Sequence, residues 1–318
     1  AGQHKPETVE LENRLKTIRQ ALQGARPALT AELSPRRKIT VTEALRQAEV
    51  LAPAVDGIQV TENPYKRVQA SSLALCALLL RLGVDPMPRL DCRNRNRIAL
   101  QSDLLGLRAL GVTSLVLNRG NPVPSVGGVA AKPVFDVGCR ELIGMANAMN
   151  EEDWGDAGHE FVIGTGAAVP STGEDPNAGQ LLARASAGAR FLQTQPCFDL
   201  PLVRRYMRAL VDAKVTWSYS VIITLAPLPS AETARWLLEN RPGTVIPEAL
   251  VQRLEQAADP VGEGIGMCAE LMGEMAALPG VSGFNLLALA NPDPVVETIE
   301  KSGLYLTYDP VAGTENDR

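Results

Sequence analysis

The pattern that most constrains the fold of this chain is a repeated alternation of short apolar runs with longer segments of helical periodicity. Such alternation is typical of consecutive βα units, in which helices join parallel strands. The apolar runs that we expect to form strands are Leu29–Leu33, Gly57–Thr61, Pro88–Cys92, Ser114–Leu117, Phe161–Thr165, Phe191–Thr194, Ser218–Ile223 and Gly283–Leu289. The sequence therefore predicts an α/β fold with a parallel sheet.

The number of expected strands separates two α/β architectures. Eight strands predict a closed (β/α)8 TIM barrel, whereas an open doubly wound sheet usually has fewer strands and a glycine fingerprint after the first. The first strand is followed by Glu32-Leu33-Ser34-Pro35 rather than GxGxxG, and the chain contains no GxxxxGK[ST] phosphate loop. A Rossmann dehydrogenase and a P-loop NTPase are both disfavoured.

Helices are expected between the strands, with extra helices before the last strand. The expected helices are Thr42–Ala52, Leu73–Leu82, Leu100–Leu110, Gly138–Met149, Gln180–Ala187, Leu202–Val211, Ala231–Glu239, Glu248–Ala257 and Gly262–Ala277. Residues 5–23 also have helical periodicity and predict an N-terminal helix packed on the barrel. We therefore divide the chain into an N-terminal helix region (residues 1–24), a barrel (residues 25–305) and a C-terminal tail (residues 306–318).

Composition excludes several classes of function. The formal net charge of -5 argues against binding to nucleic acid or to an anionic membrane surface, because such surfaces require clustered Lys and Arg. No segment approaches the roughly 20 apolar residues of a membrane span, and the polar N-terminal segment does not resemble a secretory signal. We therefore predict a cytoplasmic protein that acts on a small molecule, and whether it forms a homo-oligomer stays open.

Cysteine and histidine usage narrows the chemistry further. The five cysteines form no CxxC pair and predict reduced, mostly buried side chains. Only two histidines occur, His4 and His159, so a histidine-rich zinc site and a Ser-His-Asp triad are both disfavoured. We expect no bound metal.

Polar residues at the carboxyl ends of the expected strands are the candidate functional residues, since TIM-barrel active sites lie at that face. These ends carry Glu32, Thr61-Glu62-Asn63, Asp91-Cys92-Arg93, Asn118-Arg119-Gly120-Asn121, Thr165-Gly166 and Gln193-Thr194-Gln195. Partial desolvation of Glu32 between Ala31 and Leu33 would favour a protonated carboxyl group, as a general acid requires. The alternative for Glu32 is a structural salt bridge to Arg93 or Arg119.

The other candidates carry similar alternatives. The amide of Gln195 suits a planar heterocycle, or it anchors a loop. Arg119 suits an anion or the edge of a flavin ring, or it bridges the top of the barrel. Gly164 and Gly166 leave backbone that a ligand can approach closely, or they only permit a tight turn. Arg184 could reach a phosphate group, or it is an ordinary exposed arginine.

A series of short motifs occurs in one order along the chain. The motifs are Glu32-x-x-Pro35, Val60-Thr61, Pro88-Arg89-Leu90-Asp91-Cys92, Arg119-Gly120-Asn121-Pro122, Pro133-Val134-Phe135-Asp136, Ala187-Gly188-Ala189, Gln193-Thr194-Gln195-x-x-Phe198-Asp199, Ala226-Pro227-Leu228-Pro229-Ser230, Pro242-Gly243-x-x-Ile246-Pro247 and Gly280-Val281-x-Gly283-Phe284. Together they resemble the methylenetetrahydrofolate reductase family over roughly residues 28–300.

This resemblance implies an eight-stranded barrel that reduces 5,10-methylenetetrahydrofolate to 5-methyltetrahydrofolate. NADH or NADPH would supply hydride, which bound FAD relays. The resemblance implies that Glu32 protonates the folate and that Gln195 contacts folate and nicotinamide in turn. The cofactor-binding residues that we expect are Thr61, Arg89, Asp91, Arg119, Gly120, Asn121, Gly166 and Arg184.

Two features depart from the family pattern. Asn121 stands where the family usually has an aspartate. Loss of that negative charge would weaken the electrostatic stabilisation of a developing cation nearby by roughly 1–4 kcal/mol at intermediate dielectric. The segment of residues 164–172 also differs, near the expected flavin-ribose contacts. Alternatives to a flavin-dependent reductase are therefore a flavin-independent or other-pterin relative and a redox-silent folate-binding barrel.

Overall fold

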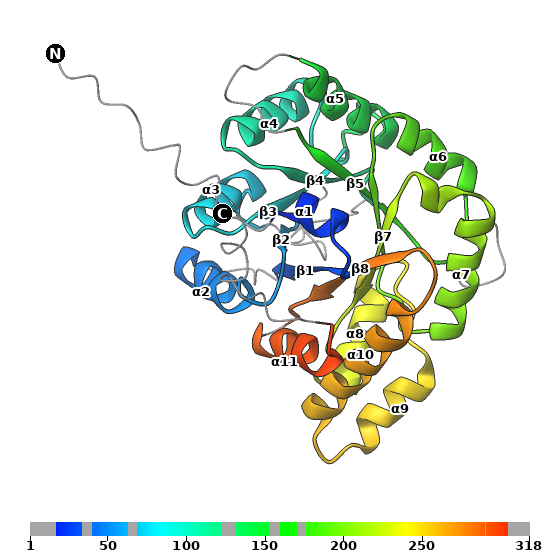
Figure 1. The fold of residues 1–318 in the computed structure, drawn as a ribbon. Helices are drawn as coiled ribbons and strands as arrows, with labels where there is room; N and C mark the ends of the chain where they lie inside the picture. Colours follow the sequence, from blue (N-terminus) through cyan, green and yellow to red (C-terminus); the bar gives the residue numbers. More distant parts are fainter. Residues whose placement is uncertain are drawn as a thin grey trace, which may run out of the picture.

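The computed structural model describes residues 17–33, 40–62, 69–121, 132–152, 160–170, 176–289 and 291–304. Eight parallel strands close into one barrel in chain order, with β8 pairing back to β1 (Figure 1). The strands are β1 (Ala28–Leu33), β2 (Gly57–Val60), β3 (Pro86–Asp91), β4 (Ser114–Asn118), β5 (Val162–Ala167), β6 (Phe191–Thr194), β7 (Ser220–Leu225) and β8 (Val281–Leu287). The predicted (β/α)8 TIM barrel is confirmed.

The helices of the described residues are α1 (Ile18–Gln23), α2 (Val41–Leu51), α3 (Ser72–Arg81), α4 (Arg97–Ala109), α5 (Cys139–Glu151), α6 (Ala178–Ser186), α7 (Leu200–Asp212), α8 (Ala231–Asn240), α9 (Glu248–Gln256), α10 (Pro260–Ala276) and α11 (Asp293–Ser302), with a 3-10 turn at Val215–Trp217. All of these except α1 lie around the ring of strands (Figure 1). The extra helices α8, α9 and α10 precede β8, as the sequence predicts.

Three details differ from the expected elements. Helix α11 follows β8 and packs against α10 and α2, although no helix was expected there from the sequence. Strand β3 begins at Pro86, two residues before the expected start at Pro88. Strands β7 and β8 are each displaced by two residues from the expected ranges. Of the expected N-terminal helix, residues 5–16 lie outside the described residues, as does the tail after residue 304.

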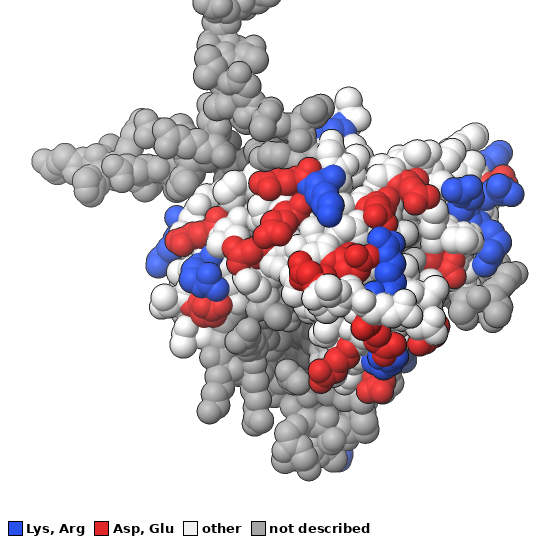
Figure 2. Space-filling view, turned by 90° about the horizontal axis from the view of Figure 1, so that it is seen from below, with Lys and Arg blue, Asp and Glu red and all other residues white. Residues whose placement is uncertain are grey.

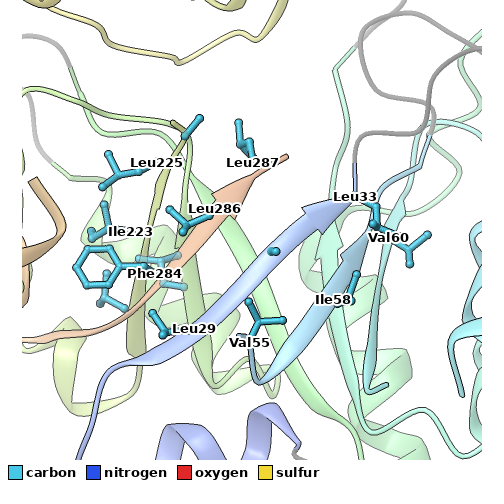
Figure 3. Packing of buried hydrophobic residues seen from close by; sticks show 14 of the residues in the cluster. Leu29, Leu33, Val55, Ile58, Val60, Ile223, Leu225, Phe284, Leu286 and Leu287 are labelled. Atoms are coloured by element: carbon cyan, nitrogen blue, oxygen red, sulfur yellow. The ribbon is translucent and has the colours of Figure 1, made fainter. Parts of the chain in front are cut away.

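Side-chain alternation along the strands divides the barrel wall into an outer and an inner surface. Outward side chains such as Leu29, Ile58 and Leu286 belong to a large buried cluster that also includes residues of the surrounding helices. Figure 3 shows these side chains packed along neighbouring strands β1, β2 and β8. This layer accounts for most of the hydrophobic core.

A second buried cluster fills the lower end of the barrel interior, which is the end formed by the amino ends of the strands. It consists of Ile18, Ala28, Met87, Val116, Val162, Phe191 and Ile222. Ile18 begins α1 and is fully buried, so this short helix closes the barrel beneath the amino ends of the strands. Figure 1 shows α1 over the middle of the ring of strands.

The upper part of the barrel interior is polar. Because Ala28, Met87 and Phe191 point inward, the residues two and four positions later along each strand direction also point inward. These residues are Thr30 and Glu32, Arg89 and Asp91, and Gln193 and Gln195. The strands therefore carry their polar side chains to the carboxyl end of the barrel, where the sequence places the candidate site.

Two further predictions can be compared with the structure. Cys76, Cys92, Cys139, Cys197 and Cys268 are all buried and form no disulfide, as predicted. Within the described ranges, none of the helices has the length and hydropathy needed to cross a bilayer. On the face shown in Figure 2, acidic and basic side chains are interspersed.

Candidate functional site

Glu32 lies at the carboxyl end of β1 and is only 4% exposed. Its two carboxylate oxygens accept hydrogen bonds from the two terminal nitrogens of Arg241, at 2.8 and 2.9 Å. Both side chains of this ion pair are buried. A bidentate guanidinium–carboxylate contact is among the stronger and more geometrically defined polar contacts in proteins.

Arg241 also approaches the second candidate catalytic residue. Its Nε lies 3.4 Å from Oε1 of Gln195, which follows β6. Glu32 and Gln195 are thus brought to the same region at the carboxyl end of the barrel, and Arg241 contacts both. The sequence analysis expected this convergence of an acid and an amide, but it did not identify Arg241.

The alternative for Glu32, a salt bridge to Arg93 or Arg119, was wrong in its partners, because the salt bridge is made by Arg241. Arg93 donates instead to the Asn94 side chain and to the backbone carbonyl of Asn121. Arg119 lies over the Phe135 ring, with its guanidinium carbon 4.3 Å from the ring centroid. Arg93 follows β3 and Arg119 follows β4, whereas Arg241 reaches Glu32 from the end of α8.

The segment that carries Arg241 is attached to the loop that carries Gln195. The backbone N–H of Val245 donates to the Pro196 carbonyl at 2.9 Å, and the N–H of Phe198 donates to the Val245 carbonyl at 2.8 Å. Residues 197 and 245 also form an isolated parallel bridge. The two loops therefore behave as one hydrogen-bonded unit.

Residues at the carboxyl ends of strands β2 and β3 form a second group of polar side chains. Arg89 donates to the Asp91 carboxylate at 3.1 Å, so these two candidates pair with each other. Glu62 is buried and accepts hydrogen bonds from the Asp91 backbone N–H and from the side chains of Asn94 and Arg95. Glu62 thus organises the loop after β3, a role that the sequence analysis did not assign.

Two of the glycines at the strand ends or within the strands leave no room for a side chain. Gly120 has a φ of +76°, and a Cβ there would lie 3.0 Å from the Cβ atoms of Asp91 and Arg93. A Cβ on Gly164 would lie 2.2 Å from the Phe191 ring. The close approach expected at Gly164 is therefore made by the protein itself rather than by a ligand.

Gly166 connects two other polar side chains. Its N–H donates to Asn118 Oδ1 at 2.7 Å, and its carbonyl accepts from Arg184 at 3.1 Å. Arg184 is half-buried rather than the ordinary exposed arginine that was the alternative. This bond uses one of the five guanidinium N–H donors of Arg184, which leaves others for a ligand.

Several buried polar atoms inside the barrel have no hydrogen-bond partner among the described residues. Gln193 donates to Gln59 at 2.9 Å, and Thr30 donates to Asn285 at 2.9 Å. The atoms without a partner are Thr61 Oγ1, Gln59 Nε2, Gln193 Oε1, Thr224 Oγ1 and Asn285 Nδ2. Such atoms cost free energy unless water or a ligand pairs with them, so we expect water or a polar ligand group to contact them.

The sequence matches the family model described as methylenetetrahydrofolate reductase across residues 17–303. The chain belongs to the methylenetetrahydrofolate reductase family. No match was found among curated proteins.

Solved structures show the same barrel. An uncharacterized protein from Clostridium thermocellum, described as binding two copies of 5-methyl-5,6,7,8-tetrahydrofolic acid, is similar at 12% identity with a TM-score of 0.62, covering 90% of this chain and 97% of that chain. A 2,3-dimethylmalate lyase of the PEP mutase/isocitrate lyase superfamily is similar at 12% identity with a TM-score of 0.50, covering 94% of this chain and 89% of that chain. At such identity these likenesses show the fold alone.

In this member of the methylenetetrahydrofolate reductase family, the expected cofactor residues fall into two groups. Arg89, Asp91, Gly120, Gly166 and Arg184 take part in the internal contacts described above. The other group is Thr61, with its unpaired buried hydroxyl, and the exposed residues Arg119 and Asn121. The second group has more capacity to bind a cofactor, because fewer of its polar atoms are used in contacts among the described residues.

Proposed function

We propose that this protein is a folate-dependent flavoprotein oxidoreductase that reduces 5,10-methylenetetrahydrofolate to 5-methyltetrahydrofolate, with NADH or NADPH as hydride donor and FAD as cofactor. Membership of the methylenetetrahydrofolate reductase family supports the reaction class. The observation that carries the proposal is the convergence of Glu32 and Gln195 on Arg241, because the reaction needs a carboxyl group and an amide beside the same ligand.

The residues at the strand ends fit FAD. The Thr61 hydroxyl is buried and unpaired among the described residues, which suits a hydrogen bond to a heterocycle. The Arg119 guanidinium lies over the Phe135 ring, and its N–H groups have no acceptor among the described residues, which suits an anion or a ring edge. We assign the binding of FAD to Thr61, Arg119, Asn121 and Arg184. When bound there, FAD would accept hydride from the nicotinamide and pass it to the folate.

The chain itself would position the folate and supply its proton. Gln195 can donate and accept hydrogen bonds at once, which suits the edge of a pterin ring. Glu32 would deliver a proton to the folate nitrogen that leaves the methylene bridge. This transfer requires the Glu32 carboxyl group to carry a proton when folate is bound.

The same ion pair favours a second candidate function. Both oxygens of the Glu32 carboxyl group are engaged by the Arg241 guanidinium rather than by a ligand, so the site could hold a reduced folate without transforming it. A redox-silent folate-binding barrel would keep the polar pocket residues and lack turnover. The folate-binding protein from Clostridium thermocellum shares this barrel fold.

An absorbance spectrum of the purified protein before and after adding FAD, followed by assays of NADH and NADPH oxidation with methylenetetrahydrofolate, tests the proposal. We expect a flavin spectrum, folate-dependent oxidation, and at least 100-fold slower folate reduction in Glu32→Gln with hydride transfer to flavin retained. Turnover without any flavin would identify a flavin-independent relative. Folate binding without oxidation under any flavin supplement would identify the redox-silent barrel.

A further inference from the structure

The segment Arg241-Pro242-Gly243 connects the two candidate catalytic residues. It does not belong to a barrel strand, because it follows α8 in the long insertion between β7 and β8. Arg241 is the C-cap residue of α8, and its own N–H donates to the Leu237 carbonyl. The helix end therefore fixes the backbone from which the Arg241 side chain reaches into the barrel mouth.

Arg241 determines where the Glu32 carboxyl group points. The guanidinium is planar, and its two contacts of 2.8 and 2.9 Å occupy both carboxylate oxygens at once. The side chains of Arg241 and Glu32 are 9% and 5% exposed, so water competes little with this arrangement. A lysine at this position offers a point charge and cannot reproduce the planar, two-point contact.

Gly243 determines where the Gln195 side chain lies. Gly243 has a φ of +84°, a left-handed conformation that favours glycine. A Cβ at this position would lie 3.1 Å from Cγ of Gln195 and 3.3 Å from Cβ of Ala168. Any other residue at 243 must therefore strain the turn and displace the Gln195 side chain.

We propose that the turn of residues 241–243 is a positioning element for the folate step, in which Arg241 orients the Glu32 carboxyl group and Gly243 seats the Gln195 amide. The identity of the ligand rests on the proposed function, whereas the contacts of the turn do not. Arg241 acts through Glu32, so its removal should matter only while Glu32 is present.

The experiment measures folate-dependent kcat and KM, 5-methyltetrahydrofolate affinity by calorimetry, and unfolding by urea, all on the full chain. The variants are Arg241→Lys, Arg241→Gln, Glu32→Gln, the charge-balanced double variant Glu32→Gln with Arg241→Gln, and Gly243→Ala. Arg235→Gln on α8 and Gly273→Ala on α10 are matched controls, because Arg235 pairs with the exposed Glu248 and Glu255, and no described residue lies within 4 Å of a Cβ on Gly273.

We expect Arg241→Gln to lower kcat at least 30-fold and Arg241→Lys to recover part of that loss. Arg241→Gln should change kcat less than 3-fold when Glu32 is already Gln. Gly243→Ala should weaken folate affinity at least 10-fold, and both controls should stay within 2-fold of the wild type. A purely structural arginine would instead lower the folded fraction and leave kcat per folded molecule unchanged.

Three results would overturn the positioning role. They are an Arg241→Gln kcat within 2-fold of the wild type, an equal loss in the Glu32→Gln background, and unchanged folate affinity in Gly243→Ala. If the wild type neither binds nor reduces a folate, the proposed function fails. The unfolding data then test only the contact between the two side chains: additive effects of Glu32→Gln and Arg241→Gln on unfolding contradict an orienting contact, and strong coupling supports that contact without a role in folate chemistry.

Discussion

The backbone N–H of Ile18 donates a hydrogen bond of 3.1 Å to the Asp85 carboxylate beneath the barrel. Asp85 also accepts from the Thr113 hydroxyl at 3.1 Å and is 3% exposed. These bonds attach α1 to the amino ends of the strands, next to the apolar layer that Ile18 completes. One buried carboxyl group thus joins α1 to Thr113 at the amino ends of the strands.

This contact predicts a pH-dependent stability. Burial raises the pKa of Asp85 to about 7 from an ordinary value of 3.8, against the opposing effect of the bonds from Ile18 and Thr113. Between these two pH values the folded state holds a proton that the unfolded state has lost, so the stability contributed by Asp85 is complete below about pH 4 and falls as the pH rises through about 7. Asp85→Asn should remove this fall and exceed the wild type by roughly 1–3 kcal/mol at pH 8. Urea unfolding from pH 5 to 8 measures the difference, and parallel curves for the two proteins would contradict it.

Gly164 gives a prediction about packing inside the barrel. Gly164→Ala places a Cβ 2.2 Å from the fully buried Phe191 ring, which cannot move away because it fills the lower barrel layer. We expect a loss of roughly 2–4 kcal/mol in the free energy of unfolding. Gly144→Ala in α5 is the control, since nothing lies within 4 Å of its Cβ and alanine should stabilise the helix by about 0.5–1 kcal/mol. Equal effects of the two substitutions would show that Phe191 relaxes.

Thr61 gives a prediction about the cofactor. Thr61→Val removes a buried hydroxyl that has no partner among the described residues, so the free energy of unfolding should change by less than about 1 kcal/mol. FAD affinity, measured by quenching of flavin fluorescence, should fall 5- to 10-fold if Thr61 contacts the flavin. Ser114→Ala is the matched control, because Ser114 carries a similar buried hydroxyl without a partner among the described residues, at the amino end of β4 rather than the carboxyl end. An unchanged FAD affinity in Thr61→Val would remove Thr61 from the cofactor site.

Glu62 gives a prediction that separates structure from catalysis. Glu62→Ala leaves the Asp91 N–H and the Asn94 and Arg95 side chains without their buried acceptor. We expect the free energy of unfolding to fall by roughly 2–4 kcal/mol, as it does when other buried networks of hydrogen bonds and ion pairs are disrupted. Glu239→Ala, which removes an exposed glutamate from α8, should change stability by less than about 0.5 kcal/mol. A stable Glu62→Ala protein that loses only folate turnover would assign Glu62 to the reaction instead.

Much of the architecture could be predicted because its signals are local. Alternation between β1 and α2, or between β3 and α4, is recorded in a few consecutive residues, and counting these units yields the closed barrel. The positions of Glu32 and Gln195 at strand ends follow from the same count. Helix α11 was not predicted, although a (β/α)8 barrel has a helix after each of its strands and Asp293–Ser302 directly follows β8.

The partners of these side chains could not be predicted in the same way. Glu32 and Arg241 are 209 positions apart, and neither the end of α8 nor the sequence around Arg241 carries a periodic signal that names its partner. The sequence by itself determined which segments become strands and which strand ends carry polar residues. Only closure of the barrel and the return of the segment after α8 decided that Arg241, rather than Arg93 or Arg119, would meet Glu32, because contact between distant residues depends on how the elements pack in space.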